Sequence, residues 1–152
     1  MATTNLVWVG TTLSSVYLLK LTLLSDFSIN CPTYYIASSL SVSGQKVWKE
    51  VFNAGSQKHG GTAPFFTTDP DAAGVNTTLA NIMKDRLLSF AVHNDPNAQA
   101  WSGVDALIWP TYGETGEVME TNDTQITIVM DTEYDKSERC KFFSEHGEVV
   151  QN

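Results

Sequence analysis

An apolar stripe at helical spacing, followed by a proline stop, constrains the fold of this chain more than any other feature of its sequence. The stripe consists of Leu79, Ile82, Met83, Leu87, Phe90 and Ala91, which share one face of a helix. We therefore predict a helix from about Thr78 to His93 with that face in the core. Pro96 ends the pattern, because a proline disfavours the helical conformation for the residue before it, here Asp95.

Coarser patterns predict four further elements. They are a helix from about Pro32 to Leu40, strands from Lys46 to Phe52 and from Gln125 to Asp131, and a terminal helix from about Lys136 to Ser144. Pro32 is placed at the first helical position, where its missing N–H costs nothing. The strand from Lys46 to Phe52 has apolar residues on both sides, so we expect both faces to be buried. A glycine-rich loop from Asn53 to Gly61 follows it.

Residues 1–23 form a separate apolar segment. The run from Leu6 to Leu24 is rich in Leu, Val and Tyr, but Lys20 interrupts it and no Lys or Arg precedes it. A secretory leader needs a basic start and a small-residue cleavage pattern. A membrane-spanning helix needs about 20 consecutive apolar residues. We expect neither here, and we interpret the segment as a buried strand or helix of the core.

The charge balance and the scattered cysteines and histidines exclude several functions. Nine Lys and Arg against seventeen Asp and Glu give a net charge of −8. A charge of this sign repels phosphate backbones and anionic membrane surfaces, so nucleic acid is not an expected partner. Cys31 and Cys140 lack CxxC spacing, and the histidines at 59, 93 and 146 are too scattered for a zinc signature. We predict no metal and no cofactor.

Two sequons make Asn76 and Asn122 candidate sites of N-glycosylation. They read Asn76-Thr77-Thr78 and Asn122-Asp123-Thr124. Together with an even number of cysteines, they favour an oxidising, extracellular compartment.

Several short motifs follow one another between residues 24 and 147. In chain order they are Ser25-Asp26-Phe27, Cys31-Pro32, His59-Gly60, Phe90-Ala91, Asp95-Pro96-Asn97, Trp109-Pro110 and Arg139-Cys140. This order resembles the C-terminal part of type-B carboxylesterases and lipases, a group that includes the cholinesterases, and it is most similar to secreted fungal members. The resemblance implies an α/β fold for residues 24–152, namely the last strands and helices of an incomplete α/β-hydrolase sheet, and a secreted parent enzyme.

The resemblance assigns one catalytic residue. In this family a serine attacks the ester, a histidine takes the serine proton and an acid orients the histidine. His59, in the loop after the strand from Lys46 to Phe52, matches the triad histidine, and an imidazole suits the task because its pKa lies near working pH. His93 and His146 are expected to have ordinary structural roles.

Departures from the family pattern affect the rest of the triad. No Gly-x-Ser-x-Gly turn occurs in the 152 residues, so the nucleophile and its oxyanion hole belong to other polypeptide. The acid normally precedes the histidine by more than the available chain, so we expect it to be absent too. Thr62 stands where the family commonly has an acidic residue. We therefore expect the chain alone to be inactive.

The resemblance also implies a disulfide between Cys31 and Cys140, for which two buried thiols are the alternative. Two functional hypotheses remain open. In the first, the chain is a fragment of a carboxylic-ester hydrolase that acts on a small-molecule or lipid ester, and its unpaired strand edges favour self-association. In the second, it is a small secreted non-catalytic binding or structural protein derived from a hydrolase fold. We expect the large aromatic residues to be core or loop anchors; they are Trp48, Phe65, Phe90, Trp101 and Trp109.

Overall fold

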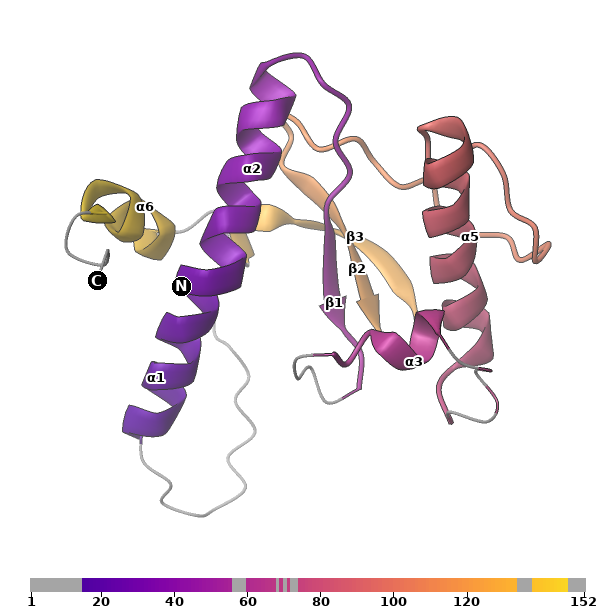
Figure 1. The fold of residues 1–152 in the computed structure, drawn as a ribbon, viewed down its shortest axis with the longest axis horizontal. Helices are drawn as coiled ribbons and strands as arrows, with labels where there is room; N and C mark the ends of the chain where they lie inside the picture. The colour runs from indigo at the N-terminus through magenta and orange to yellow at the C-terminus, as the bar shows by residue number, and fades with distance from the viewer. Residues whose placement is uncertain are drawn as a thin grey trace. The chain divides into compact units, whose positions relative to one another are not determined.

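A computed structural model describes residues 15–55, 60–67, 69, 71, 74–133 and 138–147. The chain divides into two compact units. Unit 1 comprises residues 1–45 and 130–152, and unit 2 comprises residues 46–129. Figure 1 shows unit 1 as helices, and unit 2 as a small sheet with helices beside it. The described residues thus form a mixed α/β structure, as predicted.

Unit 1 begins with one continuous helical stretch. It consists of α1 (Ser15–Ser25), a π-helical turn (Asp26–Asn30) and α2 (Cys31–Val42). α2 confirms the helix predicted from about Pro32 to Leu40, but the chain before it is already helical: Asn30 has φ −65° and ψ −52° and makes no capping bond. Pro32 has no N–H for the helix ladder, and its ring would crowd the carbonyl four residues back. The π-helical turn directly before it widens the backbone at this point.

The first helix is exposed rather than buried. Leu21, Leu23 and Leu24 are 45%, 43% and 62% exposed. The expectation of a buried segment from Leu6 to Leu24 was therefore wrong for these residues, although the helical alternative is correct for Ser15–Leu24. Residues 6–14 lie outside the described part of the chain. The physical reason is that the apolar residues of α1 are not gathered on one side, so its sequence could not indicate a covered face.

A disulfide and an ion pair hold the last helix of unit 1 in place. Cys31 and Cys140 are bonded, with their Cα atoms 5.1 Å apart, so the implied pairing is confirmed. The helix that carries Cys140, α6, spans Glu138–Glu145, close to the predicted terminal helix; residues 136 and 137 are not described. Beside the disulfide, Arg139 Nε lies 2.8 Å from the buried Asp26 Oδ2. Tyr35 also donates to the Cys140 carbonyl at 2.9 Å.

The sheet belongs to unit 2 apart from its last residue. Its strands are β1 (Glu50–Asn53), β2 (Glu117–Asn122) and β3 (Ile126–Met130), in that spatial order. β1 and β2 are parallel, with Glu50 opposite Met119. β3 confirms the predicted strand from Gln125 to Asp131, whereas β2 was not predicted.

β1 is shorter and less buried than expected. Residues 46–49 precede it without strand structure, although the Val47 carbonyl accepts from Tyr112 N–H at 2.7 Å. All four residues of β1 are half-buried, so the expectation of full burial on both faces was wrong. The reason lies in the sheet order, because β1 is an edge strand with one strand partner among the described strands.

Helix α5 (Thr77–His93) packs on the sheet and confirms the predicted helix. Its first half contributes Leu79, Ala80 and Met83 to a core that includes Ala54 and Phe65. The second half of the apolar stripe differs from expectation, since Leu87 is 55% exposed and Phe90 is 47% exposed. The buried positions at this level are taken by three polar residues, Asp85, Arg86 and Ser89.

Candidate functional site

The carboxyl ends of β1 and β2 form the candidate site. Asn53 and Asn122 end the two strands and are partners in the parallel register. Just beyond them, the backbone N–H of Gly55 donates to Asp123 Oδ1 at 2.6 Å. Ligands of open parallel sheets bind in the crevice outside the carboxyl ends of the strands. A loop that leaves β1 at this edge is therefore well placed for chemistry.

His59, the predicted catalytic residue, follows β1 at this edge but lies outside the described residues. Residues 56–59 join Gly55 to Gly60, and both glycines have left-handed backbones, with φ of +63° and +80°. A Cβ at either position would meet nothing within 4 Å, so backbone conformation rather than space favours glycine there. Gly55 is the last described residue before His59, and Gly60 is the first described residue after it.

Both ends of this loop are attached to the core of unit 2. Ala54, the residue before Gly55, is completely buried. After Gly60 the chain enters the short helix α3 (Ala63–Phe66), whose Phe65 is 4% exposed. The Phe65 ring packs edge-on against Phe52 of β1, with ring centroids 5.2 Å apart. Thr62, the departure from the family pattern, is half-buried immediately before α3.

Two carboxylates near this edge already serve the structure. Glu120 of β2 accepts from Asn53 Nδ2 at 2.6 Å through one oxygen and from Thr127 Oγ1 at 3.3 Å through the other. Asp123 accepts from Gly55 N–H, as described above. These hydrogen bonds account for the positions of both carboxylates, so we assign neither as the acid of a triad.

A third carboxylate, Glu50, lies at the other end of β1. Thr121 of β2 donates to Glu50 Oε1 at 2.6 Å. Burial raises the pKa of Glu50 above its ordinary value of 4.5, and the hydrogen bond from Thr121 partly opposes that rise. Because Glu50 is at the amino end of β1, it lies away from the edge from which the His59 loop departs.

A depression of about 200 Å³ lies between α5 and the segment that follows it. Its lining includes Ile82, Asp85, Arg86, Gln99, Val104 and Ile108. This volume is below the range of about 300–1,000 Å³ that is usual for small-molecule sites. Two of its charged residues, Asp85 and Arg86, bind the backbone around the depression.

Asp85 and Arg86 tie the segment from residue 95 to residue 109 onto α5. Asp85 accepts from the N–H groups of Trp101 and Ser102 at 3.1 Å each. Arg86 donates to the Pro96 carbonyl at 2.9 Å, to Asn97 Oδ1 at 2.6 Å and to the carbonyl of Leu107. Burial lowers the pKa of Arg86, while Asp85 and Asp95 oppose that change. These contacts explain both charges as structural.

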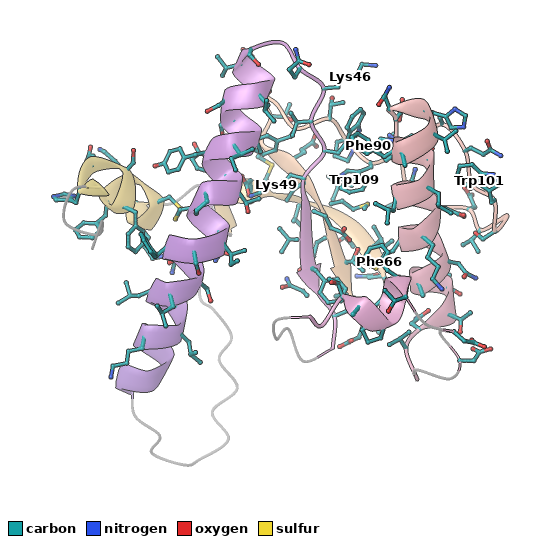
Figure 2. All side chains as sticks on the ribbon, viewed as in Figure 1. Lys46, Lys49, Phe66, Phe90, Trp101 and Trp109 are labelled. Carbon is teal, nitrogen blue, oxygen red and sulfur yellow. A yellow bond between two sulfur atoms is a disulfide. The ribbon has the colours of Figure 1, made fainter. Side chains whose placement is uncertain are left out.

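The Asp95-Pro96-Asn97 motif supplies the other half of this attachment. Asn97 accepts from Trp109 N–H at 2.8 Å and donates to the Trp109 carbonyl at 2.9 Å. The Trp109 indole then donates to the Lys49 carbonyl at 3.0 Å, just before β1. Figure 2 shows Phe90 and Trp109 directed toward the segment that precedes β1. There Phe90 packs edge-on against Trp48. The motifs thus connect α5 to the start of the sheet.

The two described histidines have surface positions. His93, in the last turn of α5, stacks on Trp101 with ring centroids 6.2 Å apart. His146 stacks on Phe142 at 4.6 Å. Both histidines are exposed.

Sequence reasoning missed Asp85 and Arg86 as buried residues, although a signal was present. They lie three and four positions after Ile82, which places them on the same helix face as the apolar stripe. Charged residues inside such a stripe indicate buried polar attachment. No sequence pattern indicated that Glu50 is buried, because its hydrogen-bond partner Thr121 belongs to strand β2, which was not predicted.

Comparison with known proteins finds no matching family model and no matching curated protein. Within the described ranges, no helix is long and apolar enough to cross a membrane. The same ranges contain no group of three His, Cys, Asp or Glu residues that could hold a metal ion.

Proposed function

We propose that this chain is the C-terminal part of a carboxylic-ester hydrolase, similar to type-B carboxylesterases and lipases, in which His59 transfers the proton during ester cleavage. The observation that supports the proposal is the parallel pairing of β1 with β2, because His59 follows β1 in the sequence and ligands of open parallel sheets bind beyond the carboxyl ends of the strands. The ordered motifs of the sequence support the family, and the Cys31–Cys140 disulfide agrees with that family's pattern and with a secreted parent.

In this mechanism the imidazole of His59 removes the proton from a serine hydroxyl as the serine attacks the ester carbonyl. The imidazole then gives that proton to the departing alcohol, and the same cycle with water releases the acid. On either side of His59, the buried residues Ala54, next to Gly55, and Phe65, in α3, attach the chain to the core of unit 2. Serine, oxyanion hole and acid come from polypeptide outside these residues.

The edge position of β1 supports a larger sheet in the whole enzyme. Its free side pairs with no described strand, and a parallel strand is normally flanked on both sides. The exposed stripe on α5, which includes Leu87, Leu88 and Val92, would also be covered in a complete domain. For the isolated chain, the same surfaces favour self-association.

Two experiments test the proposal. The isolated chain should not hydrolyse a short-chain nitrophenyl ester above background, because loss of the serine alone costs on the order of a millionfold in triad hydrolases. A gene extended upstream in frame to include a Gly-x-Ser-x-Gly turn should encode an active esterase. In that enzyme His59→Ala should reduce kcat by at least about a thousandfold.

His93→Ala is the matched control, since His93 is an exposed histidine on α5, and it should leave kcat unchanged. Equal losses in the two variants would contradict the assignment. An upstream sequence that encodes only a secretory leader would favour the non-catalytic binding or structural protein instead.

A further inference from the structure

The two sequons of the chain meet at one corner of unit 2. Asn76 Nδ2 donates to the carbonyl of Asp123, at 3.4 Å, across 47 residues of sequence. Asp123 is the middle residue of the second sequon, Asn122-Asp123-Thr124. The corner is therefore defined by Asn76 on one side and the turn between β2 and β3 on the other.

Asn76 can carry a sugar without losing its structural role. It is exposed and caps α5, with its side-chain oxygen accepting from Leu79 N–H at 3.2 Å. Capping uses Oδ1, whereas N-linked sugar attaches to Nδ2. Nδ2 carries two hydrogens, and only one is directed at the Asp123 carbonyl. Replacement of the other hydrogen leaves both contacts possible.

Asn122, which is half-buried at the end of β2, is also held through its side-chain oxygen. Its Oδ1 accepts from Thr124 N–H at 3.0 Å, from Thr124 Oγ1 at 3.0 Å and from Gln125 N–H at 3.1 Å. Nδ2 of Asn122 donates to no residue that the structure describes. The oxygen thus fixes the side chain in the turn, and the nitrogen remains available for attachment.

We propose that Asn76 and Asn122 both carry N-linked oligosaccharides, which project from this single corner when the chain passes through a eukaryotic secretory pathway. In each transfer Nδ2 attacks the anomeric carbon of a lipid-pyrophosphate-linked oligosaccharide. The new bond joins Nδ2 to that carbon, the bond from the carbon to the pyrophosphate oxygen breaks, the lipid pyrophosphate leaves and Nδ2 loses one proton.

This assignment constrains how any additional polypeptide packs on unit 2. An asparagine that bears an oligosaccharide faces water in the finished protein. Additional polypeptide can therefore approach the carboxyl ends of β1 and β2, but it leaves the Nδ2 atoms of Asn76 and Asn122 accessible to water.

The test uses the whole 152-residue chain, secreted from a eukaryotic host behind an added cleavable leader. Treatment of the secreted protein with a peptide N-glycosidase should remove two oligosaccharides, and mass spectrometry should find aspartate in place of Asn76 and Asn122. Thr78→Ala and Thr124→Ala should each remove one of the two. Thr78→Ala keeps the Asn76 side chain and its cap, so it separates glycosylation from folding.

A matched pair of outcomes decides the proposal. Two oligosaccharides on the native protein, with one lost in each threonine variant, support it. An unmodified Asn76 or Asn122 in protein from a host that glycosylates a co-expressed marker overturns the paired assignment. If the chain is not secreted, the same glycopeptides are measured in the cell extract. Because His59 plays no part in glycosylation, absence of the oligosaccharides would leave the hydrolase proposal unaffected. An inactive extended enzyme would likewise leave the glycosylation proposal unaffected.

Discussion

Replacement of Arg86 by Met tests whether the buried charge on α5 is structural. Arg86 is 9% exposed as a residue, and its guanidinium donates to the Pro96 carbonyl, to Asn97 Oδ1 and to the Leu107 carbonyl. A hydrogen bond to a charged group contributes about 1.5–3 kcal/mol, but such losses do not add fully. Met keeps much of the aliphatic packing, and the partly exposed segment can bind water after the change. We therefore expect unfolding free energy to fall by about 3 kcal/mol.

The assay is urea unfolding of the full chain followed by tryptophan fluorescence, which reports on Trp48, Trp101 and Trp109 in unit 2. With a urea dependence of about 2 kcal/mol per molar, the midpoint should fall by about 1.5 M. Lys141→Met is the control, because its side chain is 63% exposed and its ion pair with Glu145 is long, at 3.9 Å. An Arg86→Met midpoint equal to that of the control would refute the reasoning.

Three further predictions address the sheet, the disulfide and the helix cap. Because the folded pKa of Glu50 is raised above 4.5, the folded state holds the extra proton, and wild-type stability should fall as pH rises above that value. Glu50→Gln, which can still accept a hydrogen bond from Thr121, should therefore unfold at a higher temperature than wild type at pH 7 and at the same temperature at pH 4. A difference in unfolding temperature that did not change with pH would contradict the burial of Glu50. Cys140→Ser opens a link across 109 residues, which the chain-entropy model values at about 5 kcal/mol, and should speed hydrogen exchange throughout α6; unchanged exchange would show that the disulfide does not hold it. Asn76→Ala should cost about 1 kcal/mol in thermal unfolding of unglycosylated protein, and Thr78→Ala much less; equal losses would disprove the cap.

Local pattern was sufficient for some elements and insufficient for others. The predicted helix at Thr78–His93 differs from α5 by one residue, because apolar spacing, the Asn76 cap and Pro96 all act locally. β2 was missed because its stability comes from pairing with β1, and Glu117–Asn122 mixes Glu, Thr and Asn with two apolar residues. The helix over Cys31–Val42 was predicted, but the π-helical turn before it was not, because no residue type announces such a turn.

The candidate site was only partly accessible from sequence. The position of the His59 loop after a strand could be predicted, because a glycine-rich stretch follows an apolar segment. The parallel partner of that strand comes from more than 60 residues later, so the carboxyl edge itself became visible only in the fold. The Cys31–Cys140 pairing likewise depends on helices distant in sequence and was implied by family resemblance alone.

The most direct measurement is a crystal structure of the upstream-extended enzyme after its serine has reacted with a phosphonate ester. If His59 serves the chemistry proposed for it, its Nε2 will lie within about 3.2 Å of the serine Oγ, on the carboxyl side of β1. A serine Oγ served by a different base, or a His59 ring that points away from it, would contradict the account.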